Sequence, residues 1–210
     1  MLSKLPRALT ITVVLYVLPV LPKLSLFSDP RLLLIIAACF ALDLTQPALS
    51  GKAERPATDR HSLQLVMVSA AICHISPVIE WVYFTPSHPL PVPQVLGWVM
   101  VIGGTVLRAW AIRVLGRFFS AHVELQAEHN LVRQGPYRVI RHPSYSGAAL
   151  FLIGVPLLLQ TPVSLVVCLV LLAVAYGYRI PIEEKMLRAH FGSQFDDYAS
   201  STKRMIPYIW

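Results

Sequence analysis

The sequence predicts an all-α protein, a polytopic integral membrane helical bundle of five to six transmembrane helices with a cytoplasmic loop and a C-terminal helix. Hydrophobic residues make up 55% of the 210 residues, charged residues make up 14%, and the mean hydropathy is +0.60. Soluble domains contain about 25% charged residues, so this chain is too apolar for that class. No linker, low-complexity tract or fixed-period repeat divides it, and we expect residues 1–210 to form a single membrane-embedded domain.

Six apolar segments are the candidate spans. In chain order they are residues 8–21, 32–49, 63–84, 95–115, 147–159 and 163–180. Crossing the hydrocarbon core takes about 20 predominantly apolar residues, a length that the third and fourth segments reach and the first and fifth do not. We therefore expect the first and fifth segments to be tilted, kinked or partly re-entrant helices. The first also resembles the apolar part of a signal peptide, but the residues after it lack a small-x-small cleavage motif, and we interpret it as a helix.

Lysine and arginine are distributed unevenly among the connections between these segments. With six spans, one side carries Lys4, Arg7, Lys52, Arg55, Arg60, Arg117, Arg133, Arg138, Arg141, Lys185, Arg188, Lys203 and Arg204. The opposite side carries only Lys23 and Arg31. The excess of positive charge predicts that both termini and residues 129–147 face the cytoplasm. This asymmetry and attraction to anionic membrane lipids explain the net charge of +7, and no motif indicates a nucleic-acid partner.

The three cysteines, Cys39, Cys73 and Cys168, all lie inside apolar segments. Their number is odd and their spacing is not that of metal ligands, so the sequence predicts neither a disulfide framework nor a metal site. We expect these cysteines to be packing residues.

The stretch "HNLVRQGPYRVIRHPSYSG", residues 129–147, is basic and aromatic and lies between two apolar segments. Gly135-Pro136 predicts a turn. The residue before a proline is restricted to extended geometry, so His142 should end an extended approach and Pro143 should lie in the first turn of the next helix. The small residues that follow favour close helix packing in a membrane.

Each polar residue of this stretch has an ordinary interpretation when taken alone. The arginines serve as cytoplasmic anchors, Tyr137 and Tyr145 belong to the interfacial aromatic belt, and His142 is a solvated loop residue. Taken together with His129, these residues, including Arg141, supply hydrogen-bond donors and aromatic ring faces. A nucleotide-like or sulfonium-bearing cofactor requires both. Both interpretations stay open on the residues alone.

A second polar cluster, "YGYRIPIEEKMLRAHFGSQFDDY", follows the last span. Pro181 should kink this helix. Glu184 and Arg188 have the i,i+4 spacing of an exposed ion pair. Adjacent residues point about 100° apart on a helix, so one of Glu183 and Glu184 can take the exposed position while the other faces inward. A carboxylate that faces inward beside lipid is costly, and we therefore interpret it as functional. The spacing does not decide which of the two it is.

Residues 115–210 resemble the isoprenylcysteine carboxyl methyltransferase family and its bacterial and archaeal relatives, close to the phospholipid methyltransferases. The resemblance rests on the order and spacing of "HNLV", "GPYRVIRHPSYSG", an apolar helical hairpin, "EEKMLRAHFGSQFDDY" and the terminal "RMIPYI". Residues 1–115 match only as transmembrane helices. The resemblance therefore makes residues 116–210 the cofactor-binding and catalytic half.

The resemblance implies an S-adenosylmethionine-dependent methyltransferase, with S-adenosylhomocysteine as product and no Rossmann domain. The cofactor-binding residues that it implies are His129, Leu131, Val132, Gly135, Tyr137, Arg141, His142, Tyr145, Glu183 and Glu184. The catalytic residues that it implies are Arg141, Glu183, Glu184 and Arg204. Relatives often carry an arginine for the substrate carboxylate three residues after the tyrosine that matches Tyr198. This sequence has Ser201 there, and Arg204 or Lys203 are the candidates to replace that arginine.

The expected reaction is carboxyl O-methylation of an isoprenylcysteine-like acceptor, with a lipidic or prenylated substrate and membrane lipids as partners. One alternative is N-methylation of a phospholipid amine. Another is a non-enzymatic transporter or scaffold, for which Asp43, His74 and Glu80 are the polar residues within apolar segments. Arg108 and Arg113 approach the cytoplasmic edge, and we interpret them as snorkelling side chains.

Overall fold

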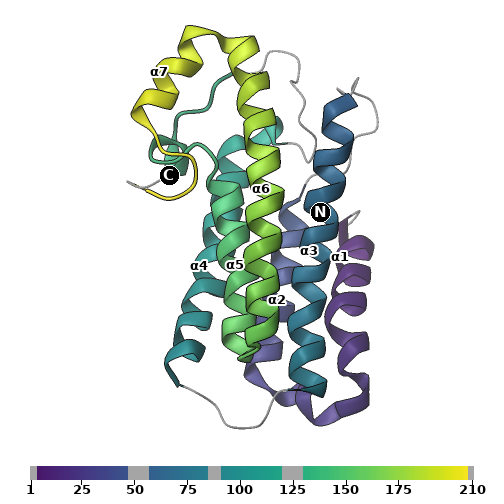
Figure 1. The fold of residues 1–210 in the computed structure, drawn as a ribbon. Coiled ribbons are helices and arrows are strands. Elements are labelled where there is room, and N and C mark those ends of the chain that lie inside the picture. The colour runs from purple at the N-terminus through teal and green to yellow at the C-terminus, as the bar shows by residue number, and fades with distance from the viewer. Residues whose placement is uncertain (1–3, 47–56, 85–90, 120–129, 208–210) are drawn as a thin grey trace.

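The computed structural model describes residues 4–46, 57–84, 91–119 and 130–207, which form a bundle of long helices with a smaller helical unit at one end (Figure 1). The elements are α1 (Leu5–Thr12), η2 (Val13–Val17), η3 (Leu18–Ser28), α2 (Pro30–Thr45), α3 (Ala57–Tyr83), α4 (Pro91–Leu115), η4 (Gly116–Phe118), η5 (Gly135–Arg138), α5 (Pro143–Leu159), α6 (Pro162–Phe191) and α7 (Ser193–Ser201). In the described ranges, extended pairing is limited to one isolated parallel bridge between Ile140 and Lys203. The predicted all-α membrane bundle is confirmed.

Four helical segments are long and apolar enough to cross a membrane. They are Leu5–Ser28, His61–Tyr83, Pro91–Phe118 and Pro162–Phe191. α5 is apolar but has 17 residues, and α2 has 16. The first segment is longer than expected, since π-helical and 3₁₀ turns carry it to Ser28, and the predicted kink is present, because Lys23 has a non-helical φ of −131° and ψ of 71°. Large apolar side chains are exposed along these helices, as a surface in contact with lipid requires.

α4 and α5 pack closely because glycines face each other across their interface. A methyl group added at Gly104 would lie 2.6 Å from the carbonyl oxygen of Gly147, and one added at Gly147 would lie 2.6 Å from the amide nitrogen of Arg108. The close approach predicted from the small residues after Pro143 is confirmed. It fixes the first turn of α5 against α4, at the end of the bundle where α7 lies.

The two ends of α5 and the start of α6 are each fixed by a local feature. α5 begins at Pro143 after His142, as predicted, and ends at Gln160 in the left-handed conformation. At the start of α6, the Glu80 carboxylate accepts hydrogen bonds from the backbone N–H of Ser164 at 2.7 Å and from its hydroxyl at 2.6 Å. Glu80 is thus a cap supplied by α3, not only a solvated boundary residue.

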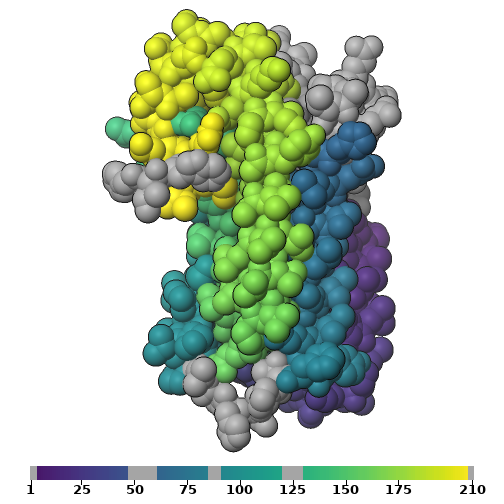
Figure 2. Space-filling view, in the orientation of Figure 1, coloured from purple at the N-terminus to yellow at the C-terminus, as the bar shows by residue number. Residues whose placement is uncertain are grey.

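α6 extends beyond the apolar layer. Its 30 residues are continuous through Pro181, and at 1.5 Å per residue they measure about 45 Å, against a hydrocarbon core of about 30 Å. The last turns of α6 therefore stand outside the bilayer core, where they support α7. Figure 2 shows α7 and the segment after it as a compact mass over this end of the bundle.

Polar contacts inside the bundle join the N-terminal helices. The Tyr16 hydroxyl is hydrogen-bonded to Nδ1 of His74, and Arg7 donates to the carbonyl oxygen of Asp43 at 3.0 Å. His74, which is half-buried, therefore serves as a helix-to-helix hydrogen-bond partner. The three cysteines are buried free thiols, as expected for packing residues.

Candidate active site

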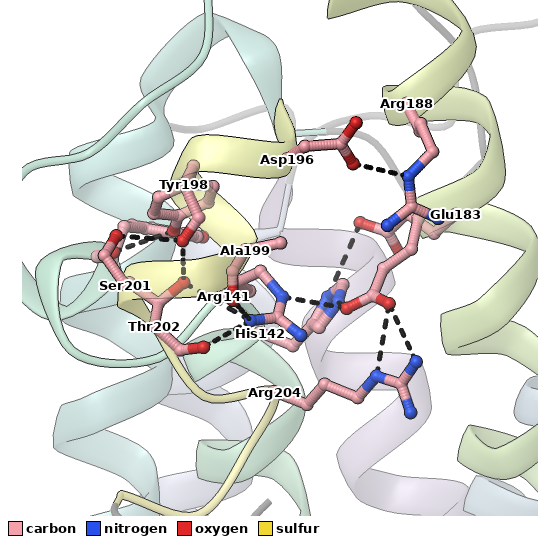
Figure 3. Close-up of polar contacts among 12 residues, drawn as sticks. Arg141, His142, Glu183, Arg188, Asp196, Tyr198, Ala199, Ser201, Thr202 and Arg204 are labelled. Carbon is pink, nitrogen blue, oxygen red and sulfur yellow. Dashed lines mark hydrogen bonds and ion pairs between the residues drawn. The ribbon is translucent and has the colours of Figure 1, made fainter. Parts of the chain in front are cut away.

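The Glu184 carboxylate lies at the centre of a charged cluster, and Figure 3 shows three of its partners, Arg141, His142 and Arg204, close to one another beside Glu183. Arg141 Nε donates to Glu184 Oε1 at 2.9 Å, and Arg204 Nε donates to Glu184 Oε2 at 3.1 Å. His142 Nε2 is 3.3 Å from Oε1. Glu184 itself is 5% exposed, so two guanidinium groups and an imidazole surround a nearly buried carboxylate. Charge-assisted contacts of this kind are the strongest hydrogen bonds available to a carboxylate.

The C-terminal segment, residues 199–205, completes this cluster. The backbone N–H groups of Arg141 and His142 donate to the carbonyl oxygens of Lys203 and Arg204 at 2.7 and 2.9 Å. The Ser146 hydroxyl donates to the carbonyl oxygen of Met205 at 2.7 Å. Because these bonds satisfy backbone groups that no helix pairs, they hold the segment along the entrance of α5.

The Arg141 side chain also joins these two segments. Besides Glu184, its guanidinium donates to the carbonyl oxygens of Ala199, at 3.0 Å, and of Thr202. Through these side-chain hydrogen bonds, Arg141 joins the segment before α5 to α6 and to the end of α7.

Glu183 lies beside this cluster in a different environment. Its Oε2 accepts a hydrogen bond from the Tyr145 hydroxyl at 2.9 Å, and its Oε1 is 3.9 Å from His142 Nδ1. The Glu183 side chain keeps 28% of its surface exposed. Arg179 Nε in turn donates to the Tyr145 oxygen at 3.0 Å, and its Nη1 donates to the Ser62 hydroxyl at 2.9 Å. One carboxylate is therefore enclosed, and its neighbour keeps an accessible edge.

Two tyrosines connect α7 with the loop before α5. The Tyr198 hydroxyl donates to the carbonyl oxygen of Tyr137 at 2.7 Å. Burial raises the pKa of both phenols, and the nearby Glu183 carboxylate raises that of Tyr137 further. The loop can turn here because Gly135 has a φ of +56°, a conformation that glycine adopts without strain.

The structure brings together most of the predicted site residues. The charged and aromatic cluster contains Arg141, His142, Tyr145, Glu183, Glu184 and Arg204. Tyr137 lies near it and accepts a hydrogen bond from Tyr198, and Gly135 begins the 3₁₀ turn that contains Tyr137; Leu131 and Val132 precede this turn in the chain. His129 lies outside the described residues.

The predicted pair between Glu184 and Arg188 is wrong. Arg188 Nε instead contacts Asp196 Oδ1 at 2.7 Å, and both side chains are more than half exposed. The i,i+4 rule considers one helix in isolation, whereas the C-terminal segment brings Arg204 to the glutamate. Arg179 was missed, although an arginine one turn before the paired glutamates is a local signal that it shares their helix face.

Fold and site together define a class: a polytopic helical membrane protein with a partly buried charged site at one end of the bundle. Comparison with known proteins narrows this class. Residues 96–189 match the model of the isoprenylcysteine carboxyl methyltransferase (ICMT) family. The predicted resemblance to this family is confirmed.

Individual relatives give the same result. The chain is 37% identical over 116 residues to a probable protein-S-isoprenylcysteine O-methyltransferase of Oryza sativa subsp. indica, an alignment that covers 54% of this chain and 61% of the relative. It is 38% identical over 128 residues to protein-S-isoprenylcysteine O-methyltransferase of Saccharomyces cerevisiae, covering 60% of this chain and 54% of the relative. The chain thus spans somewhat more than half the length of these relatives.

The fold also has a solved counterpart. The structure of the eukaryotic intramembrane Ras methyltransferase ICMT superimposes with a TM-score of 0.62 at 26% sequence identity, covering 95% of this chain and 74% of that one. The likeness therefore extends to the N-terminal helices, which lie outside residues 96–189.

Proposed function

We propose that this chain is an S-adenosylmethionine-dependent methyltransferase that O-methylates the carboxyl group of an isoprenylcysteine-like acceptor at the membrane. The observation that carries the proposal is the cluster of Arg141, His142, Tyr145, Glu183 and Glu184 at the end of an apolar bundle. A charged site next to lipid suits a reaction between a water-soluble donor and an acceptor held in the bilayer. The names of the matched relatives support the same reaction.

The residues present fit the proposed cofactor. S-adenosylmethionine carries cationic groups, and the accessible edge of Glu183 beside the aromatic ring of Tyr145 suits a cation. When bound, the cofactor supplies a methyl group on a positively charged sulfur. We assign Glu183, Tyr145 and Tyr137 to cofactor binding, with backbone groups near Leu131, Val132 and Gly135. His129 stays a prediction from the resemblance.

We assign the enclosed glutamate a different role. The Glu184 carboxylate is held by Arg141, Arg204 and His142, so few of its lone pairs are left for a ligand. It fixes the loop and the C-terminal segment against α6, and thereby holds the neighbouring Glu183 and Tyr145 in place. Preorganisation of this kind is what a displacement reaction requires, because the enzyme aligns the reacting atoms and excludes water.

The acceptor chemistry follows from ionisation. A carboxylate is already ionised at neutral pH and needs no general base, whereas an amine must first lose a proton. An amine acceptor would need a base at the site, and His142 is the candidate. Both of its ring nitrogens face carboxylates. This arrangement favours a carboxyl acceptor. A phospholipid amine stays the second candidate because Ser201, where relatives often carry an arginine, only hydrogen-bonds the carbonyl oxygen of Tyr198.

Residues 1–210 form one methyltransferase domain in this proposal, with both termini and the site on the cytoplasmic side. In support, Arg7 reaches Asp43 and Arg108 reaches Ser144, so the start of α1 and the end of α2 share one end of the bundle with the start of α5. An exposed Asp197→Cys variant tests the orientation, since the native thiols are buried. A membrane-impermeant thiol reagent should label it in inside-out vesicles and not in intact cells; the reverse pattern contradicts the orientation.

Calorimetry with S-adenosylmethionine and S-adenosylhomocysteine on detergent-purified protein tests the function. We expect micromolar binding that Glu183→Gln lowers at least tenfold and that Asp197→Asn, an exposed control, leaves unchanged. Methyl transfer is then assayed on a prenylcysteine and on phosphatidylethanolamine, which separates the two acceptor classes. A folded wild-type protein that binds neither cofactor form removes the methyltransferase proposal and favours transport or scaffolding.

A further inference from the structure

Arg108 is a half-buried cation on α4 that the proposed cofactor site does not use. It lies on α4 at the level of the first turn of α5, where the closeness of Gly147 fixes its backbone. Its guanidinium Nη1 donates to the carbonyl oxygen of Ser144 at 2.9 Å and is 3.0 Å from the Ser144 hydroxyl. Ser144 precedes Tyr145, the residue that contacts Glu183. Arg108 is therefore one residue removed from the proposed site, on its membrane side.

The partners of Arg108 are uncharged. Its Nε and Nη2 face the side-chain oxygen of Gln46, at 3.2 and 3.0 Å, when that amide is oriented to accept them. The ionisable groups around it are the phenols of Tyr137, Tyr145 and Tyr176, the His74 imidazole and the Asp43 carboxylate. Among the described residues, no carboxylate lies within ion-pair distance of Arg108. A cation at this depth is usually paired with an anion.

Two features of this place suit a carboxylate ligand. The Nε and Nη2 edge of arginine is the fork that binds a carboxylate through two parallel hydrogen bonds, and here one amide oxygen faces it. The first turn of α5 carries no acidic residue, so the positive end of its dipole adds to the charge of Arg108.

The other candidate cations of the site are engaged or turned to solvent. Arg141 and Arg204 both donate to Glu184, and Arg179 is engaged by the hydroxyls of Tyr145 and Ser62. Lys203 is exposed and pairs with the loop through its backbone. Ser201 carries no charge. Lys203 and Arg204 are the residues predicted to replace the family arginine. Neither is therefore a buried group that is available to bind the substrate carboxylate.

We propose that Arg108 binds the carboxylate of the methyl acceptor and thereby selects acidic over neutral lipid-borne acceptors. The inference rests on the proposed function, because it places the acceptor carboxylate next to the cofactor site. In it, the acceptor replaces the Gln46 oxygen on the arginine fork, and the apolar part of the acceptor stays on the lipid side of α4. Arg108 is then the residue that compensates for Ser201.

Equilibrium binding of a matched pair of ligands tests this assignment without requiring turnover. The probes are N-acetyl-S-farnesylcysteine and its carboxamide, which differ only in the acid group. Wild-type protein, Arg108→Gln and Arg113→Gln are compared by calorimetry in detergent. Arg113 is a matched control because it lies on the same helix and is exposed. Affinity for S-adenosylhomocysteine is measured on all three proteins.

The wild type should bind the acid about 10- to 100-fold more tightly than the carboxamide, as expected for a charge-assisted bidentate contact. Arg108→Gln should bring this ratio close to one, with unchanged affinity for S-adenosylhomocysteine, and Arg113→Gln should keep the wild-type ratio. If Arg108→Gln does not fold, Arg108→Lys decides, because its charge without the fork should lower the ratio only in part.

Three results overturn the assignment. The first is an acid-to-carboxamide ratio that is near one in the wild type. The second is a ratio that Arg108→Gln, or Arg108→Lys where it replaces that variant, leaves at the wild-type value. The third is a loss of S-adenosylhomocysteine affinity in the Arg108 variant, which would assign the cation to the carboxylate of the cofactor. A wild type that binds the acid selectively but binds no cofactor contradicts the proposed function and leaves the role of Arg108 supported.

Discussion

Substituting Glu184 by glutamine tests the distinction between the two adjacent glutamates. The amide has nearly the same shape as the carboxylate but carries no charge. In the variant, Arg141 and Arg204 lose their anionic partner, and one amide N–H₂ group is directed at groups that are themselves donors. The variant therefore perturbs the electrostatics of the cluster without creating a cavity.

The magnitude follows from burial. Glu184 and Arg141 have side chains that are 6% and 10% exposed, and removing one partner of a buried ion pair destabilises a protein by about 3–5 kcal/mol. The Arg204 side chain is 36% exposed, so solvent screens its contribution and we add nothing for it. For a chain of 150–250 residues, each kcal/mol shifts the midpoint of thermal unfolding by about 2–4 °C, which gives a decrease of about 6–20 °C.

The assay is thermal unfolding in detergent, with the Glu183→Gln variant measured in parallel. Glu183→Gln keeps an oxygen that can accept the hydrogen bond from Tyr145 and loses only the charge, and the side chain keeps an accessible edge, so the substitution should cost about 1 kcal/mol. We expect Glu184→Gln to lower stability and Glu183→Gln to lower cofactor affinity. An unfolding midpoint for Glu184→Gln within about 2 °C of the wild type would refute this reasoning.

Three further perturbations have outcomes that the structure determines. Gly104→Val should destabilise the α4–α5 interface by about 3 kcal/mol, because the added carbon meets backbone atoms, while Gly103→Val, in open space, should be tolerated; thermal unfolding of both variants checks this. Glu80→Ala removes the cap of α6 and should cost about 1–2 kcal/mol in the same assay, and an unchanged midpoint would contradict that role. Burial raises the pKa of Tyr198, so the folded state binds the proton of this phenol more tightly than the unfolded state does. The contribution of Tyr198 to the free energy of unfolding is therefore present at neutral pH and is lost as pH rises above about 10. Unfolding midpoints between pH 9 and 11 should fall less steeply in Tyr198→Phe than in the wild type; equal slopes would exclude this linkage.

The helices could be predicted from the sequence because each depends on local properties. Apolar runs located the four helices long enough to span a membrane and the two shorter helices, α2 and α5, and the restriction before Pro143 predicted where α5 begins. The length of the first helix was underestimated because its apolar run was ended at residue 21. Helical turns resume after the break at Lys23 and reach Ser28, which no local rule predicts.

The site could be predicted only in part from local rules. Its main contacts join residues far apart in the chain, since Arg141 meets Glu184 across 43 positions and Thr202 across 61. Helix spacing assigned Glu184 to Arg188 because it compares residues within one helix. The resemblance to a family named residues that lie together in the structure, since it depends on their order along the whole C-terminal half. It could not say which glutamate is enclosed.

The difference between the two glutamates depends on residues beyond the matched region. Residues 96–189 contain the loop, Tyr145 and both glutamates, but Arg204 and the segment that pairs with the loop come later. A site made of residues 96–189 alone would leave Glu184 without Arg204 and the backbone of Arg141 without Lys203. Glu184 would keep its contacts with Arg141 and His142, but its Oε2 would lose Arg204, so the two glutamates would differ less. Because the C-terminal segment binds the Glu184 carboxylate, Glu183 is left as the carboxylate available to a cation. Substitutions in this segment should therefore alter cofactor affinity, although its residues do not contact the cofactor.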